Sequence, residues 1–236
     1  MAKKPVMFRD KIEVVYNVER WNLLRCLREK AKIVMEALRK AGLYSIVHGS
    51  VARGDVHPKS DVDVVVPYVI SSVIVESALL NAGFQIVEKT IVQATPFHVI
   101  KAHITLDNDV VVTFPLVNFK KLEREFYKFG GEVDLAMLYG GRRVPGVDKR
   151  LILIIPTEQG HIEQSIIGIE EEVSKLLGVS LDIVKERKYV LLRRDTIGRT
   201  GVFLKVSVPI EESFEKVLKE LADRNPAVRK ILQERA

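Results

Sequence analysis

Apolar positions recur with two different periods along the first half of the chain. Between residues 21 and 40 they are spaced by three and four, which predicts a long helix with one buried face. Gly42 follows where a helix C-cap is expected. Beyond Tyr44 the apolar runs become short and are separated by polar turns, which predicts strands. The recurring helical positions are Leu24, Leu27, Ala31, Val34 and Leu38.

The order of the expected elements indicates the fold class. A strand is expected at residues 12–18, before the long helix, and a strand, a turn and a second strand at 44–66. A helix at 71–82 and another at 119–129 enclose three further strands at 85–93, 97–105 and 110–117. Strand-helix-strand followed by a strand meander predicts an α/β fold with a mixed sheet of three to five strands and helices on one face.

The stretch 140–149 is the best candidate for a linker, because it combines three glycines, a proline and several charges. It divides the chain into a larger part, residues 1–139, and a smaller α+β part, residues 140–236. In the second part we expect a strand at 150–155 and then a turn at 156–160. A helix from about residue 162 to Gly178, strands at 189–193 and 202–208, and two short terminal helices should follow.

Composition and charge narrow the class of protein. No run of uncharged apolar residues approaches the roughly 18 that a membrane helix needs, which predicts a soluble, cytoplasmic protein. Cys26, the only cysteine, allows no internal disulfide and is expected to pack within its helix. High charge with little Asn and Gln hints at a thermophilic source.

The net charge of +6 permits an anionic partner such as RNA. Residues 1–130 carry 19 Lys and Arg against 14 Asp and Glu, a net of +5 that leaves +1 for the remainder. Arg25, Arg28, Lys32 and Arg39 lie beside the apolar face of the long helix. They form either a solvated flank or a stripe that contacts phosphate.

Residues 48–66 contain the densest set of chemically informative side chains. Gly49 and Ser50 directly follow a strand, where a glycine lets backbone N–H groups approach a phosphate and Ser50 adds a hydroxyl donor. A helix or turn that starts at Ser50 would add free N–H groups. The chain holds no Gly-Lys-Ser/Thr loop of the Walker type, which argues against an ordinary ATPase.

Two carboxylates open the next strand on the same face. Asp61 and Asp63 are two residues apart, about 7 Å between α-carbons, while Val62 and Val64 point into the core. Two such acids suit Mg²⁺, which is held by one or two carboxylates together with substrate phosphates. A third acid from a neighbouring strand would complete a two-metal site.

Asp109 is the candidate for that third acid, and Asp107, two residues earlier, is the alternative. The sequence Asp107-Asn108-Asp109 is also a good turn between two strands. The five histidines show no metal-ligand spacing. His103, on the strand before Asp109, either faces the site or is a packed or surface residue.

Gly49-Ser50, Ala52-Arg53-Gly54 and Ser60-Asp61-Val62-Asp63 together resemble the signature of the DNA polymerase beta-like nucleotidyltransferase superfamily. The motif Gly-Ser-x-Ala-Arg-Gly is most similar to the motif of archaeal CCA-adding enzymes and of small bacterial and archaeal nucleotidyltransferases. The motif covers residues 48–66, and the resemblance to the fold extends over about 20–130.

The resemblance implies a role for each matching residue. Gly49, Ser50 and Ser60 would bind the nucleotide, and Arg53 would touch phosphate or brace the loop. Asp61, Asp63 and Asp109 would hold two Mg²⁺ ions, with Asp109 helping to activate the acceptor hydroxyl. Residues 1–139 would then form the catalytic domain, and residues 140–236 would form a domain that could bind the acceptor.

The reaction implied is attack of an acceptor hydroxyl on the α-phosphate of a nucleoside triphosphate such as ATP, with release of pyrophosphate. Basic clusters at 142–143, 149–150, 185–188 and 193–194 favour an RNA acceptor, such as a tRNA-like molecule. Three alternatives stay open: transfer to a protein side chain, transfer to a small-molecule hydroxyl, and an RNA- or ribosome-binding module on the same fold without activity.

Overall fold

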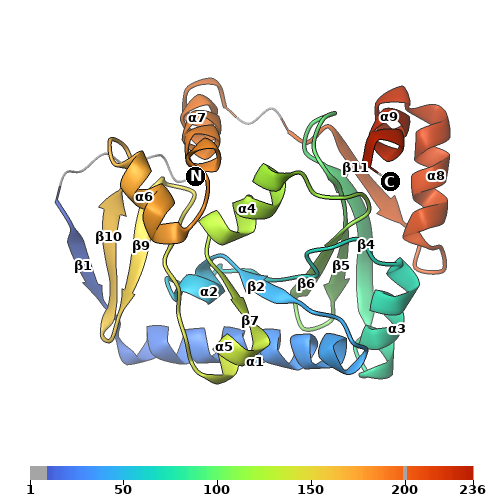
Figure 1. Ribbon diagram of the computed structural model, residues 1–236. Helices are drawn as coiled ribbons and strands as arrows, with labels where there is room; N and C mark the ends of the chain where they lie inside the picture. Colours follow the sequence, from blue (N-terminus) through green and yellow to red (C-terminus); the bar gives the residue numbers. More distant parts are fainter. Residues whose placement is uncertain (1–9, 199–200, 236) are drawn as a thin grey trace. The chain divides into compact units, whose positions relative to one another are not determined.

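The computed structural model describes residues 10–198 and 201–235, and the chain forms two compact units, each built from three segments (Figure 1). Unit 1 comprises residues 1–29, 47–60 and 124–200. Unit 2 comprises residues 30–46, 61–123 and 201–236. The helices α1 (Val18–Lys40) and α4 (Lys121–Phe129) contribute residues to both units.

Unit 2 contains five strands in the order β11, β4, β5, β6, β3. Their bounds are β3 (Val62–Val65), β4 (Ile86–Gln93), β5 (Ile100–Leu106), β6 (Val110–Pro115) and β11 (Leu204–Val208). β3 and β6 run parallel, whereas the other neighbours are antiparallel. The mixed α/β sheet that the sequence predicts is therefore confirmed.

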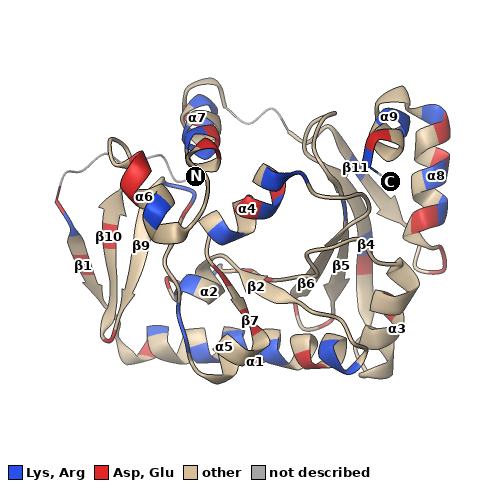
Figure 2. Cartoon of the chain, viewed as in Figure 1, with Lys and Arg blue, Asp and Glu red and all other residues tan. Residues whose placement is uncertain are grey.

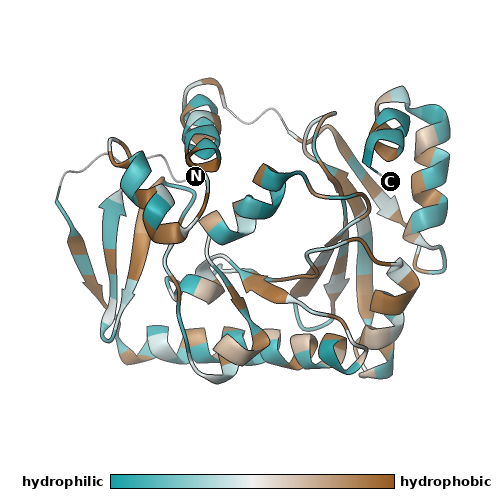
Figure 3. Ribbon diagram, viewed as in Figure 1, coloured by the Kyte–Doolittle hydropathy of each residue, from teal (hydrophilic) through white to brown (hydrophobic). Residues whose placement is uncertain are grey.

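One face of these strands is apolar and covered by helices. Residues two apart along the strands, such as Val62 and Val64 on β3 or Ile104 on β5, are fully buried. Figure 3 shows this apolar character along β5 and β6. The covering helices include α3 (Ser72–Asn81) and α8 (Phe214–Arg224), and α9 (Pro226–Arg235) follows α8. Phe114 of β6 and Phe214 of α8 meet edge to face at 5.6 Å.

A buried lysine links the sheet of unit 2 to these helices. Lys89 of β4 lies on the apolar face and donates from Nζ to Glu76 of α3 at 2.9 Å and to the carbonyl oxygen of Glu212 at 2.5 Å. It also donates to the carbonyl oxygen of Ile210 at 3.2 Å and lies 5.2 Å from the ring of Phe214. Because a buried ammonium is stable only when fully paired, this cluster fixes how α3 and the β11–α8 connection pack on β4.

Unit 1 has a second sheet of four strands in the order β1, β10, β9, β8. These are β1 (Ile12–Val15), β8 (Gly146–Val147), β9 (Ile152–Thr157) and β10 (Gly160–Ser165), all paired antiparallel. Gly160 is required at its position, because a β-carbon there would lie 1.9 Å from the carbonyl oxygen of Val14.

The remaining elements of unit 1 are short strands and helices. β2 (Ile46–His48) and β7 (Glu132–Asp134) are neighbours, and α2 (Ser50–Arg53) and α5 (Leu135–Tyr139) directly follow them. Two helices, α6 (Glu170–Leu177) and α7 (Leu181–Ile197), pack against each other. Lys and Arg residues occur at intervals along α1 and on α7 (Figure 2).

Several expectations for the second half of the chain are wrong. The strand expected at 189–193 lies within α7, and the helix expected from residue 162 begins only at Glu170, because residues 160–165 form β10. Thr157 therefore starts a hairpin turn, in which its hydroxyl accepts from the amide of Gly160 at 3.1 Å. Cys26, expected to pack within α1, is exposed.

The compact units also do not divide at residue 140, where the sequence suggests a linker. The stretch 140–149 connects α5 to β8 inside unit 1, and the chain returns to unit 2 at residue 201 to add β11 beside β4. Both units therefore draw on segments from each side of that boundary. Among the described residues, no helix combines the length and the apolar character needed to cross a bilayer.

Replacing Lys89 should destabilise unit 2. In Lys89→Met, Glu76 and two carbonyl oxygens lose their shared donor, which we expect to lower the free energy of unfolding by about 2–4 kcal/mol. Urea denaturation followed by circular dichroism measures this. Lys219→Met on the exposed side of α8 is the matched control and should stay within about 0.5 kcal/mol of the wild type. Equal stability of the two variants would contradict the proposed role of Lys89.

Candidate active site

The turn after β2 has a backbone that only glycine adopts readily. Gly49 has φ 81° and ψ −140°, and a β-carbon built there would meet no atom within 4 Å. Its amide donates to the carbonyl oxygen of Gly131 at 2.9 Å, which ties the turn to the residue just before β7. The first bond within α2 runs from the amide of Arg53 to the carbonyl oxygen of Gly49, so the amides of Ser50, Val51 and Ala52 precede it.

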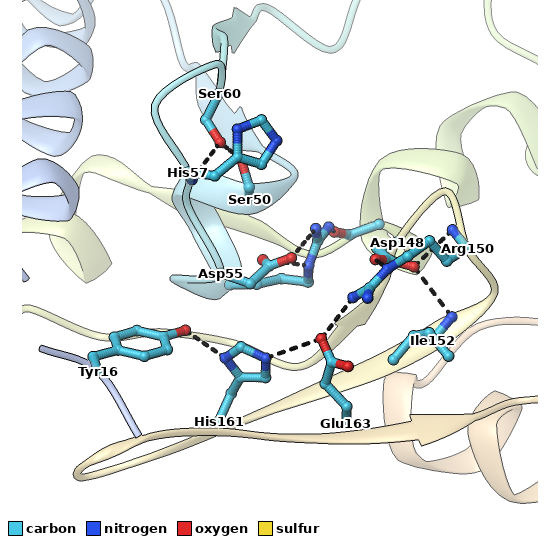
Figure 4. A network of polar contacts seen from close by, with 12 residues as sticks. Tyr16, Ser50, Asp55, His57, Ser60, Asp148, Arg150, Ile152, His161 and Glu163 are labelled. Carbon is cyan, nitrogen blue, oxygen red and sulfur yellow. Dashed lines mark hydrogen bonds and ion pairs between the residues drawn. The ribbon is translucent and has the colours of Figure 1, made fainter. Parts of the chain in front are cut away.

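Two hydroxyl groups join the ends of the loop that follows α2 (Figure 4). Ser50 Oγ donates to Ser60 Oγ at 3.2 Å, and the amide of His57 donates to the same Ser60 oxygen at 3.0 Å. These bonds hold the two ends of the loop between α2 and β3 together. Ser50 and Ser60, which the resemblance implies for nucleotide binding, are therefore neighbours in space. We refer to Gly49, Ser50 and Ser60 as the serine turn.

Two arginines support the serine turn from inside unit 1. Arg53 is buried, donates from Nε and Nη2 to Asp55 at 2.9 Å each, and donates from Nη1 to the carbonyl oxygen of Gly130 at 2.5 Å. Of the two roles that the sequence leaves open for Arg53, this geometry favours bracing the loop over touching phosphate.

Arg28 is the second support and was not identified as such from the sequence. Its guanidinium is buried and donates to the carbonyl oxygens of Val51 and Ala52 in α2 at 3.1 and 3.2 Å. Burial, together with the nearby charge of Arg143, lowers its pKa to about 10, so it remains charged. The basic stripe of α1 is therefore neither a plain solvated flank nor a phosphate contact at this position, since Arg28 anchors α2.

The acidic strand lies in unit 2. Val62 and Val64 are buried, as expected, while Asp63 is partly exposed and Asp61, just before β3, is exposed. The alternation of a strand places the two carboxylates on the face opposite the helices. The register pairs Asp63 with Val111 of β6, and Val111 with Thr105 of β5, so this acidic face continues across three strands.

Asp109 lies in a turn rather than on the acidic face. Asp107, Asn108 and Asp109 connect β5 to β6, and the amide of Asp109 donates to the carbonyl oxygen of Leu106 at 3.1 Å. Asp109 has a φ of 65°, its side chain is 95% exposed, and its carboxylate lies 3.9 Å from Nζ of Lys30 in α1. Within residues 10–198 and 201–235, no three His, Cys, Asp or Glu residues form a group that could hold a metal ion.

The positions of β6 that share the acidic face carry no acid. They are Val111, which lies beside Asp63, and then Thr113 and Pro115 further along the strand. Thr113 is paired in register with His103 of β5, and its hydroxyl lies 2.8 Å from His103 Nδ1. Lys101, two residues before His103, also belongs to this face. The register therefore places His103 on the acidic face, which is one of the two positions considered for it from the sequence.

Burial controls the charges on this face. It lowers the pKa of Lys101, while the carboxylates of Asp63 and Glu123 act to raise it. Burial also lowers the pKa of His103 to about 4, and the positive charges of Lys101 and Lys205 add to this effect. The face therefore combines Asp61 and Asp63 with an imidazole that is neutral at neutral pH and with the side chain of Lys101.

The donor set of the acidic face fits one Mg²⁺ ion. Asp61 and Asp63 supply two carboxylates from one strand, which is the usual protein contribution when substrate phosphates complete the coordination. A two-metal site needs a further carboxylate, and the neighbouring positions Val111 and Thr113 do not provide it.

A chain of buried polar contacts lies in unit 1 on the far side of the loop from the serine turn (Figure 4). Tyr16 Oη and His161 Nδ1 are 2.6 Å apart, and His161 Nε2 lies 3.4 Å from Glu163. Arg150 donates to Glu163 and to Asp148 at 2.6 Å each. Burial raises the pKa of Tyr16 to about 12, so its phenol is protonated and donates to His161.

This network should make stability depend on pH. Hydrogen bonds from His161 and Arg150 lower the pKa of Glu163 to about 2, although burial opposes them. A depressed carboxyl pKa stabilises the folded state above the unfolded value and loses this effect as pH falls through the folded value. The contribution, about 3 kcal/mol at neutral pH, should therefore disappear between about pH 5 and pH 2.

Denaturation of Glu163→Gln at a series of pH values tests this expectation. The stability advantage of the wild type over the variant should shrink steadily from about pH 5 to pH 2. Glu13→Gln on the exposed side of β1 is the control and should show a small, nearly constant difference. A wild-type advantage for Glu163 that persists unchanged at pH 2 would contradict the network's role.

Comparison with known proteins supports the assignment from the motif. Residues 27–99 match the family model of the nucleotidyltransferase domain, a range that contains Gly49, Ser50, Asp61 and Asp63 and ends before Asp109 and Thr113. No curated protein and no solved structure matches the chain. Residues 27–99 are thus similar to the nucleotidyltransferase domain, which is consistent with the resemblance of the motif to the DNA polymerase beta-like superfamily.

Proposed function

We propose that this protein transfers a nucleoside monophosphate from a nucleoside triphosphate to an acceptor hydroxyl, with Mg²⁺ as cofactor and pyrophosphate as product. The observation that carries the proposal is the pair Asp61 and Asp63 at the start of β3, an otherwise buried strand within the range that matches the nucleotidyltransferase domain. Carboxylates placed in this way repel each other unless a cation lies close to both.

The serine turn supplies the groups that would bind the triphosphate. The left-handed backbone at Gly49 leaves room for a phosphate to approach, and Ser50 and Ser60 offer hydroxyl groups at the neck of the loop. Arg28 and Arg53 keep the turn in place through carbonyl oxygens and Asp55, so ordering it need not occur on binding. Ser60 is followed directly by Asp61, which joins the turn to the acidic strand.

Asp61 and Asp63 would hold the Mg²⁺ ion. When bound, such an ion neutralises phosphate charge and stabilises the oxygen that departs with pyrophosphate. Asp109 would serve as a third carboxylate only with a rearranged turn, because its side chain is exposed and next to Lys30. His103 is neutral and bonded to Thr113, and its lowered pKa makes it a weak acceptor for the proton of an acceptor hydroxyl.

The acceptor proposed is RNA. Net charge is +6, with most of the excess in residues 1–130, and basic side chains recur along α1 and α7 (Figure 2). A protein side chain and a small-molecule hydroxyl are the other acceptors that the same chemistry serves.

Substitution of either acid should abolish transfer. We expect Asp61→Asn and Asp63→Asn to lower labelling of an acceptor by at least about 100-fold while circular dichroism and the melting temperature change little. The assay incubates the protein with Mg²⁺, each labelled triphosphate in turn, and RNA or protein from its source. Asp223→Asn on the exposed side of α8 is the control and should retain full activity. Activity of either acid variant at the wild-type level would contradict the proposed site.

The third carboxylate can be tested in the same assay. If Asp109 takes part, Asp109→Asn should lose activity as completely as Asp61→Asn, whereas Asp107→Asn should be nearly unaffected. The reverse result would assign the role to Asp107. Full activity of both variants would exclude both acids of this turn from the reaction.

A second function is supported by one specific observation. Val111 and Thr113 stand on β6 where an acid would complete the face, so the domain could bind a nucleotide or RNA without turning it over. Calorimetry separates the two functions. Binding of Mg²⁺–triphosphate by the wild type, lost in Asp63→Asn and accompanied by no labelling of any acceptor, would establish the binding module and overturn the transferase.

A further inference from the structure

Unit 1 contains a pocket of about 420 Å³ beside the loop that carries Ser60. Its wall combines the start of α1 and the residue before it, the loop at residues 55–58, the turn between β8 and β9, and β10. The lining outside the loop consists of Asn17, Glu19, Arg20, Leu23, Arg150 and Glu163. Residues 55–58 belong to the loop of the 48–66 motif, and Arg150 and Glu163 of the polar network in Figure 4 also line the pocket.

Arg20 is the cation in this pocket whose hydrogen-bonding capacity is not used. Its guanidinium lies 4.2 Å from the centre of the Tyr16 ring, a stacking contact that fixes its position. Its Nε atom is buried and has no hydrogen-bond partner among the described residues. Arg150, by contrast, donates to Asp148 and Glu163. A buried, positioned donor without a partner is costly unless a ligand satisfies it.

The charge of the pocket indicates which kind of ligand it accepts. Of the three lining carboxylates, Asp55 is paired with Arg53 and Glu163 with Arg150, and the third belongs to Glu19. Hydroxyl and amino groups of a ligand can donate to Glu19, and a carbonyl oxygen or ring nitrogen can accept from Arg20. The apolar surface of Leu23, Val56 and Pro58 suits a flat ring. Ribose and a nucleobase match this combination.

The position of the pocket connects it to the serine turn. Asp55, Val56, His57 and Pro58 line it, and Ser60, only two residues beyond Pro58, is bonded to Ser50. Two residues span at most about 7 Å of chain, so one loop borders both places. A nucleoside in the pocket would therefore lie across this loop from phosphates bound at the serine turn.

We propose that this pocket binds the nucleoside part of one substrate, with Arg20 donating to the base or the sugar and Glu19 accepting from hydroxyl or amino groups. The proposal rests on the proposed function and deepens it. Two sources supply this chemistry: the nucleoside of the donor triphosphate and the terminal nucleoside of an RNA acceptor.

Arg20→Met is the principal test, because it keeps a long stem and removes the guanidinium. Arg25→Met, an exposed position one and a half turns further along α1, is the matched control. Leu23→Trp, which fills the pocket while leaving Arg20 in place, guards against an effect of Arg20→Met on folding alone. Calorimetry would measure the affinity for each Mg²⁺–nucleoside triphosphate and for Mg²⁺–tripolyphosphate, and the labelling assay would give KM for the acceptor RNA.

Each result decides the question. If the pocket takes the donor, Arg20→Met and Leu23→Trp should weaken triphosphate binding about tenfold or more and leave tripolyphosphate binding unchanged. If it takes the acceptor, triphosphate binding should be unchanged and KM for the RNA should rise by a similar factor. No change in either quantity, or equal losses for the triphosphate and tripolyphosphate, would overturn the pocket proposal.

Failure of the proposed function would show itself differently. In that case the wild type would bind neither Mg²⁺–triphosphate nor Mg²⁺–tripolyphosphate. Binding of free adenosine, cytidine, guanosine and uridine to the pocket would then be measured by chemical-shift changes in the protein's NMR spectrum. Nucleoside binding by the wild type that is lost in Arg20→Met would support the proposal that the pocket binds a nucleoside. Absence of any nucleoside binding would overturn it.

Discussion

The candidate chemistry depends on the parallel pairing of β3 with β6, because this pairing gives one strand two different environments. On one side Val62, Val64 and Val110 are buried under helices, and on the other Asp63 stands beside Val111. A shift of the register by one residue would bury the carboxylates and expose the valines. The burial of the valines therefore keeps the acids in place, although no valine takes part in the chemistry.

Unit 1 secures the serine turn by a different means. The turn contains little apolar surface of its own, and its position depends on buried guanidiniums that donate to backbone carbonyl oxygens. Arginine suits this task, since its planar group offers several donors in fixed directions and stays charged when buried. In both units the residues that maintain the geometry are thus distinct from those expected to touch a substrate.

The sequence predicts the part of the fold and site that depends on local pattern. The long helix, the strands of the first half and the placement of Val62 and Val64 in the core follow from periods of 3.6 and 2, and the structure confirms them. In α7 the prediction was wrong, because Tyr189 to Arg193 resemble a strand by composition and only the packing of α6 and α7 decides for a helix. The roles of Arg28 and Arg20 depend on partners far along the chain, which no local pattern contains.

On the acidic face, too, local sequence pattern does not predict which side chains lie together. Alternation along 101–105 could have indicated that Lys101 and His103 share a side, but not that this side faces the same way as Asp63, since that needs the register of β5, β6 and β3. Likewise, Asp109 matches the spacing of a third acid in the sequence. Its position in an exposed turn is established only by its backbone angle and its contact with Lys30, which the sequence does not predict.

The interleaving of the two units has a consequence for synthesis on the ribosome. Unit 2 begins with residues 30–46 but receives its edge strand β11 and the helices α8 and α9 only from residues 201–235. Until those residues emerge, β4 has an unpaired edge and Lys89 lacks the carbonyl oxygens of Ile210 and Glu212. Unit 2 must therefore stay incomplete through most of translation, a period in which chaperone contact with the unpaired edge of β4 would protect the nascent chain from aggregation.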